Sequence, residues 1–226
     1  MRTLIISDIH ERTQDVQHWL KMSQEVDHTI FLGDFFDTHF ADKDPTGMIS
    51  LLWDLYKRED VTLIWGNHDT HYAFTHPWFK ASGYQPLTQQ LIWAADLMPV
   101  WLKFKVATSV DNYLISHAGF RPETIKHLED EAQALKLAFR GEFHPLWTPG
   151  WDVGGNDRWS GATWQRWKNL LPVEGWKGQI VGHTYDKKVR ERNRSYCLDT
   201  GLKNALLIED GTVTVLNHPE KEKEPR

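Results

Sequence analysis

The sequence predicts an α/β protein in which two central mixed sheets pack face to face with helices outside them, a four-layer αββα sandwich. Two observations predict this class. Residues 1–65 alternate between short apolar strands and amphipathic helices, whereas residues 178–216 form a series of strands with a hairpin signal at Asp210-Gly211. Because no repeat or linker divides the chain, we expect one domain over residues 1–217 and a charged C-terminal tail over residues 218–226.

The N-terminal part has the βαβαβ pattern that is typical of a parallel sheet. Its second helix has an apolar face, because Met48, Leu52 and Leu55 recur at helical spacing. We expect the strands at residues 3–7, 28–32 and 61–65, and the helices at residues 13–24 and 47–58.

The second half of the chain changes character and adds further strands, so that the whole chain predicts two sheets. Strands are expected at residues 102–108, 112–118, 178–183, 195–199, 204–209 and 212–216. A helix is expected to open at Pro122 and to turn Ile125, Leu128, Leu135 and Phe139 inward. An irregular stretch rich in Gly and Trp covers residues 141–161. Eight of the 12 Trp residues lie between Trp93 and Trp176, as core or lid residues or as stacking platforms for a substrate.

Composition excludes several classes of function. The net charge is only −5 with both signs interleaved, so we expect no general nucleic-acid binding. Cys197 is the single cysteine and cannot form an internal disulfide. No apolar run approaches the ~20 residues that cross a bilayer, and the first strand leaves no room for a signal peptide. We therefore expect a cytoplasmic protein without a membrane partner.

Metal-ligand types of side chain follow five separate strands, directly where each strand ends. These residues are Asp8 and His10, Asp34 and Asp37, Asn67 with His68 and Asp69, His117, and His183. Because the carboxyl ends of parallel strands form the natural site of an α/β protein, we expect these side chains to converge. Carboxylate, imidazole and carboxamide ligands without a thiolate suit a pair of divalent ions such as Mn, Fe or Zn. One carboxylate can bridge two ions about 4 Å apart, which would clamp a phosphoryl group and generate a hydroxide nucleophile.

In order and spacing, these motifs resemble the calcineurin-like metallophosphoesterase superfamily. The motifs are Asp8-Ile-His10, Gly33-Asp34 to Asp37, Gly66-Asn67-His68-Asp69, Ser116-His117 and Gly182-His183. The stretches "ISHAGF", "HPLWTPGWDVGGNDRWSG" and "VGHT...YCLDTG" are similar to the phosphoprotein phosphatase branch, including phage-type serine/threonine phosphatases and dinucleoside-tetraphosphatase-like enzymes.

The resemblance implies a role for each motif residue. It implies that Asp8, His10 and bridging Asp34 hold one metal ion, and that Asp34, Asn67, His117 and His183 hold the other. A hydroxide that bridges the ions would attack phosphorus, and His68, oriented by Asp37, would protonate the leaving oxygen. Asn67 and Arg158 would bind phosphate oxygens.

The chain also departs from the usual motifs of this branch. Gly normally follows DxH and Arg normally follows GDxxD, whereas this chain has Glu11-Arg12 and Thr38-His39. One phosphate-binding arginine is therefore missing. Arg12 or Arg121 is a candidate replacement, or the substrate differs from those of close relatives.

The resulting hypothesis is a metal-dependent phosphatase that hydrolyses phosphate monoesters of a small molecule or a phosphoprotein, with Mn as the favoured metal and Fe or Zn as alternatives. A phosphodiesterase or dinucleoside polyphosphate hydrolase of the same superfamily is the enzymatic alternative. Diesterases often carry GHxH near the C-terminus, where this chain has Tyr185 at the second His position. A silent scaffold is the non-enzymatic alternative, although such proteins have usually lost ligands that are all present here.

Overall fold

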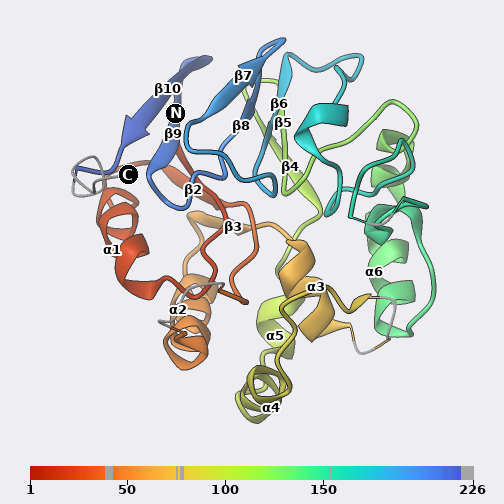
Figure 1. The fold of residues 1–226 in the computed structure, drawn as a ribbon. Coiled ribbons are helices and arrows are strands. Elements are labelled where there is room, and N and C mark those ends of the chain that lie inside the picture. Colours follow the sequence, from red (N-terminus) through yellow and green to blue (C-terminus); the bar gives the residue numbers. More distant parts are fainter. Residues whose placement is uncertain (39–42, 75, 77–78, 153, 220–226) are drawn as a thin grey trace.

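Two five-stranded mixed sheets form the centre of the molecule, as the sequence predicts (Figure 1). The computed structural model describes residues 1–38, 43–74, 76, 79–152 and 154–219 of the chain. The first sheet has the order β10-β9-β1-β2-β3, formed by Thr212–Asn217, Asn204–Glu209, Arg2–Ile6, His28–Phe31 and Val61–Leu63. The second has the order β4-β5-β6-β8-β7, formed by Ala107–Val110, Tyr113–Ser116, Gly178–Val181, Ser195–Cys197 and Arg190–Arg192.

Strands β1, β2 and β3 are parallel, which confirms the predicted βαβαβ unit. Helices α1 (Thr13–Met22) and α2 (Pro45–Tyr56) make the crossovers. Helix α2 starts two residues earlier than expected because the Asp44 carboxylate accepts a hydrogen bond from the Gly47 amide and Pro45 occupies the first turn. The two crossovers bring the ends of all three strands to one edge of the sheet.

The layers follow from the alternation of side chains along each strand. In β1, Ile5 faces the second sheet, whereas Leu4 and Ile6 face helices α1 and α2. The core between the sheets joins Ile5, Ile30, Leu32 and Ile64 to Val110, Ile115, Ile180 and Leu198. Helices α1 and α2 lie on one side of the paired sheets, and α6 (Glu131–Phe139) lies on the other (Figure 1).

Several expected boundaries are wrong. The strand expected at residues 102–108 is only β4, Ala107–Val110, preceded by the short helix α5 (Met98–Trp101) and one bridge between Ile64 and Lys105. The helix expected from Pro122 begins as a 3-10 helix at Ile125–Asp130 and continues as α6. Helices α3 (Asn67–Ala73) and α4 (Pro86–Ala94) and strand β7 were not predicted. The short 3-10 helix Pro145–Trp147 interrupts the irregular stretch at residues 141–161, and a second 3-10 helix, Trp167–Asn169, follows that stretch.

The C-terminal hairpin is confirmed, with Asp210 and Gly211 at positive φ between antiparallel β9 and β10. His218 was expected in a solvated tail, but it is 4% exposed. Its ring packs on His18 and Trp19, which ties the end of the first sheet to α1. Residues 220–226 lie outside the described residues, so the rest of the tail remains a prediction.

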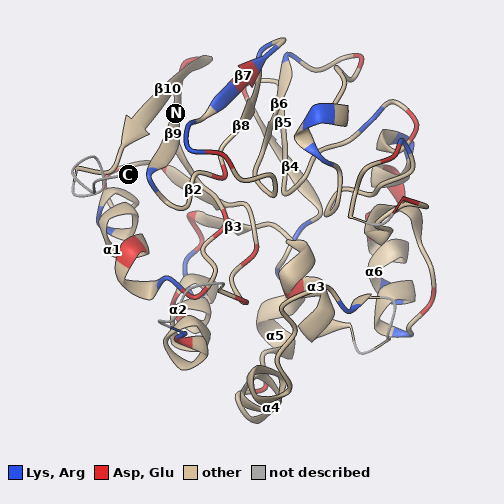
Figure 2. Ribbon diagram, viewed as in Figure 1, with Lys and Arg blue, Asp and Glu red and all other residues tan. Residues whose placement is uncertain are grey.

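Acidic and basic residues are distributed over the whole chain, with blue and red segments interleaved in Figure 2. Within the described ranges, no helix combines the length and the hydrophobicity that a membrane span requires.

Candidate dimetal active site

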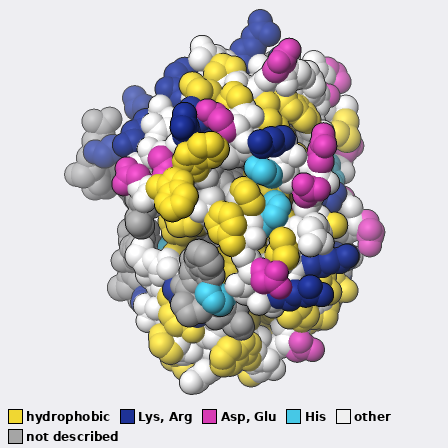
Figure 3. Space-filling view, turned by 90° about the vertical axis from the view of Figure 1, so that its right-hand side faces the viewer, with side chains coloured by type: hydrophobic (Ala, Val, Ile, Leu, Met, Phe, Trp, Pro, Cys, Tyr) yellow, Lys and Arg dark blue, Asp and Glu magenta, His cyan; other side chains and the backbone are white. Residues whose placement is uncertain are grey.

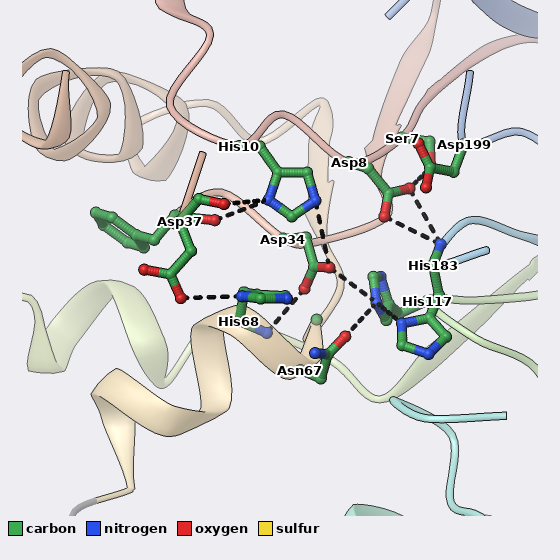
Figure 4. A network of polar contacts seen from close by, with 12 residues as sticks. Ser7, Asp8, His10, Asp34, Asp37, Asn67, His68, His117, His183 and Asp199 are labelled. Atoms are coloured by element: carbon green, nitrogen blue, oxygen red, sulfur yellow. Dashed lines mark hydrogen bonds and ion pairs between the residues drawn. The ribbon is translucent and has the colours of Figure 1, made fainter. Parts of the chain in front are cut away.

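The predicted ligand residues converge at the ends of strands from both sheets (Figure 4). Asp8 and His10 follow β1, Asp34 follows β2, and Asn67 opens α3 directly after β3. From the second sheet, His117 follows β5 and His183 follows β6. Five residues of this region have a φ between 40° and 64°, namely Asp8, His10, Asp34, Asp37 and His183. This left-handed conformation is unfavourable for most side chains, and its concentration at one place is typical of a functional site.

Glycines allow the strand ends to approach one another. A Cβ atom on Gly33 would fall inside contact distance of the Gly66 backbone, and one on Gly66 would collide with Asp34. A Cβ atom on Gly182 would collide with the side chains of Ser7 and Asp8. The glycines before three of the ligand residues are therefore required by packing at the site.

Of the three groups of described side chains that could hold a metal ion, two share one carboxylate, and the third is Asp37 with His68 and His71. Asp8, His10 and Asp34 form the first group, and Asp34, His117 and His183 form the second. Within each group, the ligand atoms lie within 4.8 Å of one another. The Asn67 Oδ1 atom lies 3.1 Å from His117 Nε2, so the carboxamide also faces the second group. These side chains are the ones that the resemblance implies as ligands, and Asp34 belongs to both groups. Their binding of metal stays a prediction.

Hydrogen bonds orient two of the imidazoles for metal binding. His117 Nδ1 donates to the Leu32 carbonyl at 2.7 Å, which turns Nε2 toward Asp34 at 3.4 Å. His10 Nδ1 lies 3.0 Å from the Phe36 carbonyl oxygen, and its Nε2 lies 3.7 Å from Asp34 Oδ2. A protonated Nδ1 bound to a carbonyl leaves a lone pair on Nε2, as a metal-ligating histidine requires. The buried donor set therefore fits divalent ions.

Burial and neighbouring charges shift the pKa values of the candidate ligands in both directions. Burial opposes ionisation of Asp34, but the charges of His117 and His68 hold its pKa well below the usual value. Burial likewise opposes protonation of His117, yet Asp34 raises its pKa to about 9. For Asp8, burial and the nearby Asp199 raise the pKa well above its usual value. Two divalent ions would replace these protons and favour the ionised carboxylates.

Beside the cluster, His68 and Asp37 form the predicted pair. His68 Nδ1 lies 2.9 Å from Asp37 Oδ2, and Figure 4 shows the His68 ring between Asp37 and Asp34. Although burial opposes protonation, Asp34 and Asp37 raise the pKa of His68. The backbone amide of His68 donates to Asp34 Oδ1 at 2.9 Å, which fixes the helix start against the bridging carboxylate.

Comparison with known proteins gives the family. The profile of the calcineurin-like phosphoesterase family matches residues 1–187. The chain belongs to this family. It is accordingly a hydrolase that acts on phosphate esters. No curated protein matches the chain.

Solved structures share the fold of this phosphoesterase. A cold-active protein-tyrosine phosphatase of a psychrophilic Shewanella species has a TM-score of 0.69 and 17% identity, over 95% of this chain and 77% of that one. A protein serine/threonine phosphatase from Saccharomyces cerevisiae has a TM-score of 0.56 and 15% identity, over 97% of this chain and 82% of that one. At these identities, the likeness shows the fold.

The three arginines predicted to bind substrate differ in their exposure and their contacts. Arg158 is exposed, and its guanidinium lies 4.8 Å from the centre of the Trp159 ring. Arg12 is bound to Asp15. Arg121 donates to the Asn169 carbonyl and pairs with Glu123.

Sequence reasoning missed Arg166, whose charge reaches the cluster. The pKa of His183 is well below its usual value because of burial, then His117, then Arg166. The Nε of Arg166 donates to the Gly154 carbonyl at 2.6 Å, which anchors the side chain. Trp164, two residues earlier, packs edge-on against the His183 ring. The sequence signal was present, because Arg166 follows the NDR motif by eight residues in the same Trp-rich stretch.

Asp69 has a structural function that its motif position did not reveal. Its carboxylate accepts hydrogen bonds from the backbone amides of Asp34, Phe35 and Gly66 at 2.8 to 3.0 Å. Burial and the charge of Asp34 raise the pKa of Asp69 to about 7. Asp69 therefore joins the loops after β2 and β3, which carry the bridging carboxylate and the carboxamide.

The Trp-rich stretch contributes to both the core and the surface. Trp147 and Trp167 are buried, whereas Trp151 is 87% exposed and Trp159 is 44% exposed. Figure 3 faces the side of α6 and residues 141–161, where hydrophobic side chains gather with histidines between them. Part of the stretch is thus available to contact a substrate.

Proposed function

We propose that this phosphoesterase is a two-metal phosphomonoesterase whose substrate is a phosphoprotein or a small phosphorylated molecule. The observation that carries the proposal is the sharing of Asp34 by two ligand groups, with the His68–Asp37 pair directly beside them. Two divalent ions bound there, with Mn favoured, would polarise the phosphoryl oxygens and supply a hydroxide nucleophile near neutral pH.

The side chains of the site then have separate tasks. Asp8 and His10 would hold one ion, and His117, His183 and Asn67 the other, with Asp34 between them. The hydrogen bonds to the Leu32 and Phe36 carbonyls keep two of these imidazoles in the ligating orientation.

Proton transfer to the leaving oxygen is assigned to His68. Asp37 accepts a hydrogen bond from the Nδ1–H of this ring and so directs the opposite nitrogen, Nε2, away from itself. An imidazole is well suited to this step because its pKa lies near neutral pH.

The phosphate dianion requires cationic partners beyond the ions. Arg166 and Arg12 are the candidates, because the charge of Arg166 acts on His183 and the charge of Arg12 acts on Asp199. A guanidinium can bind two phosphate oxygens in one plane. The exposed position of Arg158 over Trp159 favours contact with the outer part of a substrate. Tyr185 occupies the second His position of the diesterase motif and is 60% exposed. Because a tyrosine replaces the imidazole that diesterases often carry there, this position favours a monoesterase.

The test compares two chromogenic esters under identical conditions. We expect p-nitrophenyl phosphate to be hydrolysed at least about tenfold faster than bis-p-nitrophenyl phosphate, because the site is built for a dianion. A protein loaded with metal that prefers the diester would contradict the proposal and favour the phosphodiesterase alternative. Loaded protein without activity on either ester would favour a scaffold.

A further inference from the structure

Three side chains rather than one lie against the carboxylate of Asp37. Its Oδ2 lies 2.9 Å from His68 Nδ1 and 2.6 Å from His71 Nε2. Its Oδ1 accepts a hydrogen bond from the hydroxyl of Tyr72. All three donors lie on helix α3, and His71 is 0% exposed. His68, the proposed general acid, therefore shares the Asp37 carboxylate with His71 and Tyr72. Neither of these two residues has a role in the proposed reaction.

The protonation of His71 follows from a backbone contact. The amide of Ala81 lies 3.2 Å from His71 Nδ1, and an amide N–H can only donate. Nδ1 is therefore the acceptor, so the neutral ring carries its proton on Nε2, the atom that lies 2.6 Å from Asp37 Oδ2. Burial, which lowers the pKa of His71, agrees with a neutral ring.

The hydroxyl of Tyr72 is directed in the same way. It accepts a hydrogen bond from the Gln85 amide at 3.0 Å, which leaves its own proton for Asp37. The Tyr72 ring stacks on Tyr84 with centroids 5.4 Å apart. The two orienting amides thus come from one segment, residues 81–85, which packs on α3.

These contacts fix the orientation of the Asp37 carboxylate plane. A carboxylate bonded only to His68 could rotate about its Cβ–Cγ bond, and the imidazole would follow it. Donors at both oxygens restrict that rotation, and they also keep the charge of Asp37 stabilised, with its pKa lowered to about 2 by donors that overcome burial. Proton transfer is sensitive to such alignment.

We propose that His71 is a positioning residue that orients His68 for protonation of the leaving group by holding the Asp37 carboxylate. Tyr72 assists at the other carboxylate oxygen, and the amides of residues 81 and 85 set the direction of both donors. This inference rests on the proposed function.

The decisive measurement is the dependence of kcat on the leaving group. Phenyl phosphate needs a proton on its leaving oxygen, whereas 2,4-dinitrophenyl phosphate does not. In His71→Ala, we expect kcat for phenyl phosphate to fall by about tenfold or more, and kcat for the dinitrophenyl ester to change by less than about twofold. KM and metal content should stay at the wild-type level. His71→Gln, whose amide can donate from nearly the position of Nε2, should recover most of the loss.

A double-mutant cycle separates positioning from general support of the fold. If His71 acts through His68, then His71→Ala should cost nothing further in a His68→Asn background. Additive losses, or an equal loss on both esters, would overturn the proposal. Tyr72→Phe keeps the stacked ring and removes only the donor, so it should show a smaller version of the same leaving-group effect. If His71→Ala does not fold, His71→Gln and Tyr72→Phe decide the question.

A second readout does not depend on catalysis. In metal-free protein with ¹⁵N-labelled histidine, NMR should show His71 as the neutral Nε2–H tautomer, and Tyr72→Phe should shift the Nδ1–H resonance of His68. A proton on Nδ1 of His71 would overturn the inference even in an active phosphatase. Conversely, the expected tautomer in a protein without monoesterase activity would leave the geometry intact and refute the proposed function.

Discussion

At the scale of single residues, the contacts of each arginine are the basis for proposing that it binds the phosphate or the rest of the substrate. The charge of Arg166 acts on His183, whereas Arg158 lies exposed over Trp159. The motif NDR favoured Arg158 in the sequence, because a motif assigns a residue type to a position and does not show which way an irregular segment turns it. The convergence of the candidate ligands was predictable, because each lies shortly after a strand and strand ends have a defined place in an α/β fold.

Replacing Arg166 or Arg158 by alanine should have different effects on kcat/KM. Arg166→Ala should lower kcat/KM for p-nitrophenyl phosphate by about 10- to 100-fold, because a charged hydrogen bond contributes roughly 1.5–3 kcal/mol. Arg158→Ala should change this kcat/KM by less than about threefold, because p-nitrophenyl phosphate is too small to reach the exposed Arg158. Arg166→Lys, which keeps the charge without the planar fork, is the matched control and should recover part of the loss. A larger loss in Arg158→Ala would restore the assignment made from the motif.

At the scale of elements, regular strands and crossovers were predictable and short helices were not. Residues 102–108 alternate apolar and polar side chains as a strand would. In the structure, however, Phe104 packs on Trp65 and Trp101 at the end of α5, and only Lys105 bridges to the first sheet. Helix α3 has all seven residues buried, so it shows no amphipathic pattern. Helix α3 begins within the Gly66-Asn67-His68-Asp69 motif and is stabilised by tertiary contacts. Local hydrophobic periodicity contains no information on such contacts.

The close approach of strand ends gives a prediction for Gly182. In Gly182→Ala, the added methyl group would collide with Asp8 and Ser7, so Asp8 must move. We expect the affinity for Mn²⁺ to fall by about 10- to 100-fold, the range seen when support of a ligand is disturbed. The control is Gly175→Ala, whose added Cβ has no atom within 4 Å although its φ, unlike that of Gly182, is left-handed at 84°. Equal metal affinity in the two variants, measured by titration, would show that the close approach is not needed for the site.

At the scale of the whole molecule, the site exists only when the two sheets are docked. The first sheet supplies Asp8, His10, Asp34 and Asn67, and the second supplies His117 and His183. The apolar core between the sheets therefore sets the distance between the two metal groups. The sandwich itself was predictable from the alternation of elements. The relative placement of the sheets was not, because it depends on side-chain packing between residues far apart in the sequence.

The central claim is that two ions, joined by Asp34, are both required for hydrolysis. The most direct test strips the protein of metal, adds Mn²⁺ in steps, and records bound metal per chain and the rate on p-nitrophenyl phosphate in the same samples. We expect no activity without metal and full activity as binding approaches two ions per chain. Asp34→Asn should lower the affinity of both sites, because it removes the shared carboxylate. Full activity in metal-free protein, or full activity at one bound ion per chain, would contradict the account.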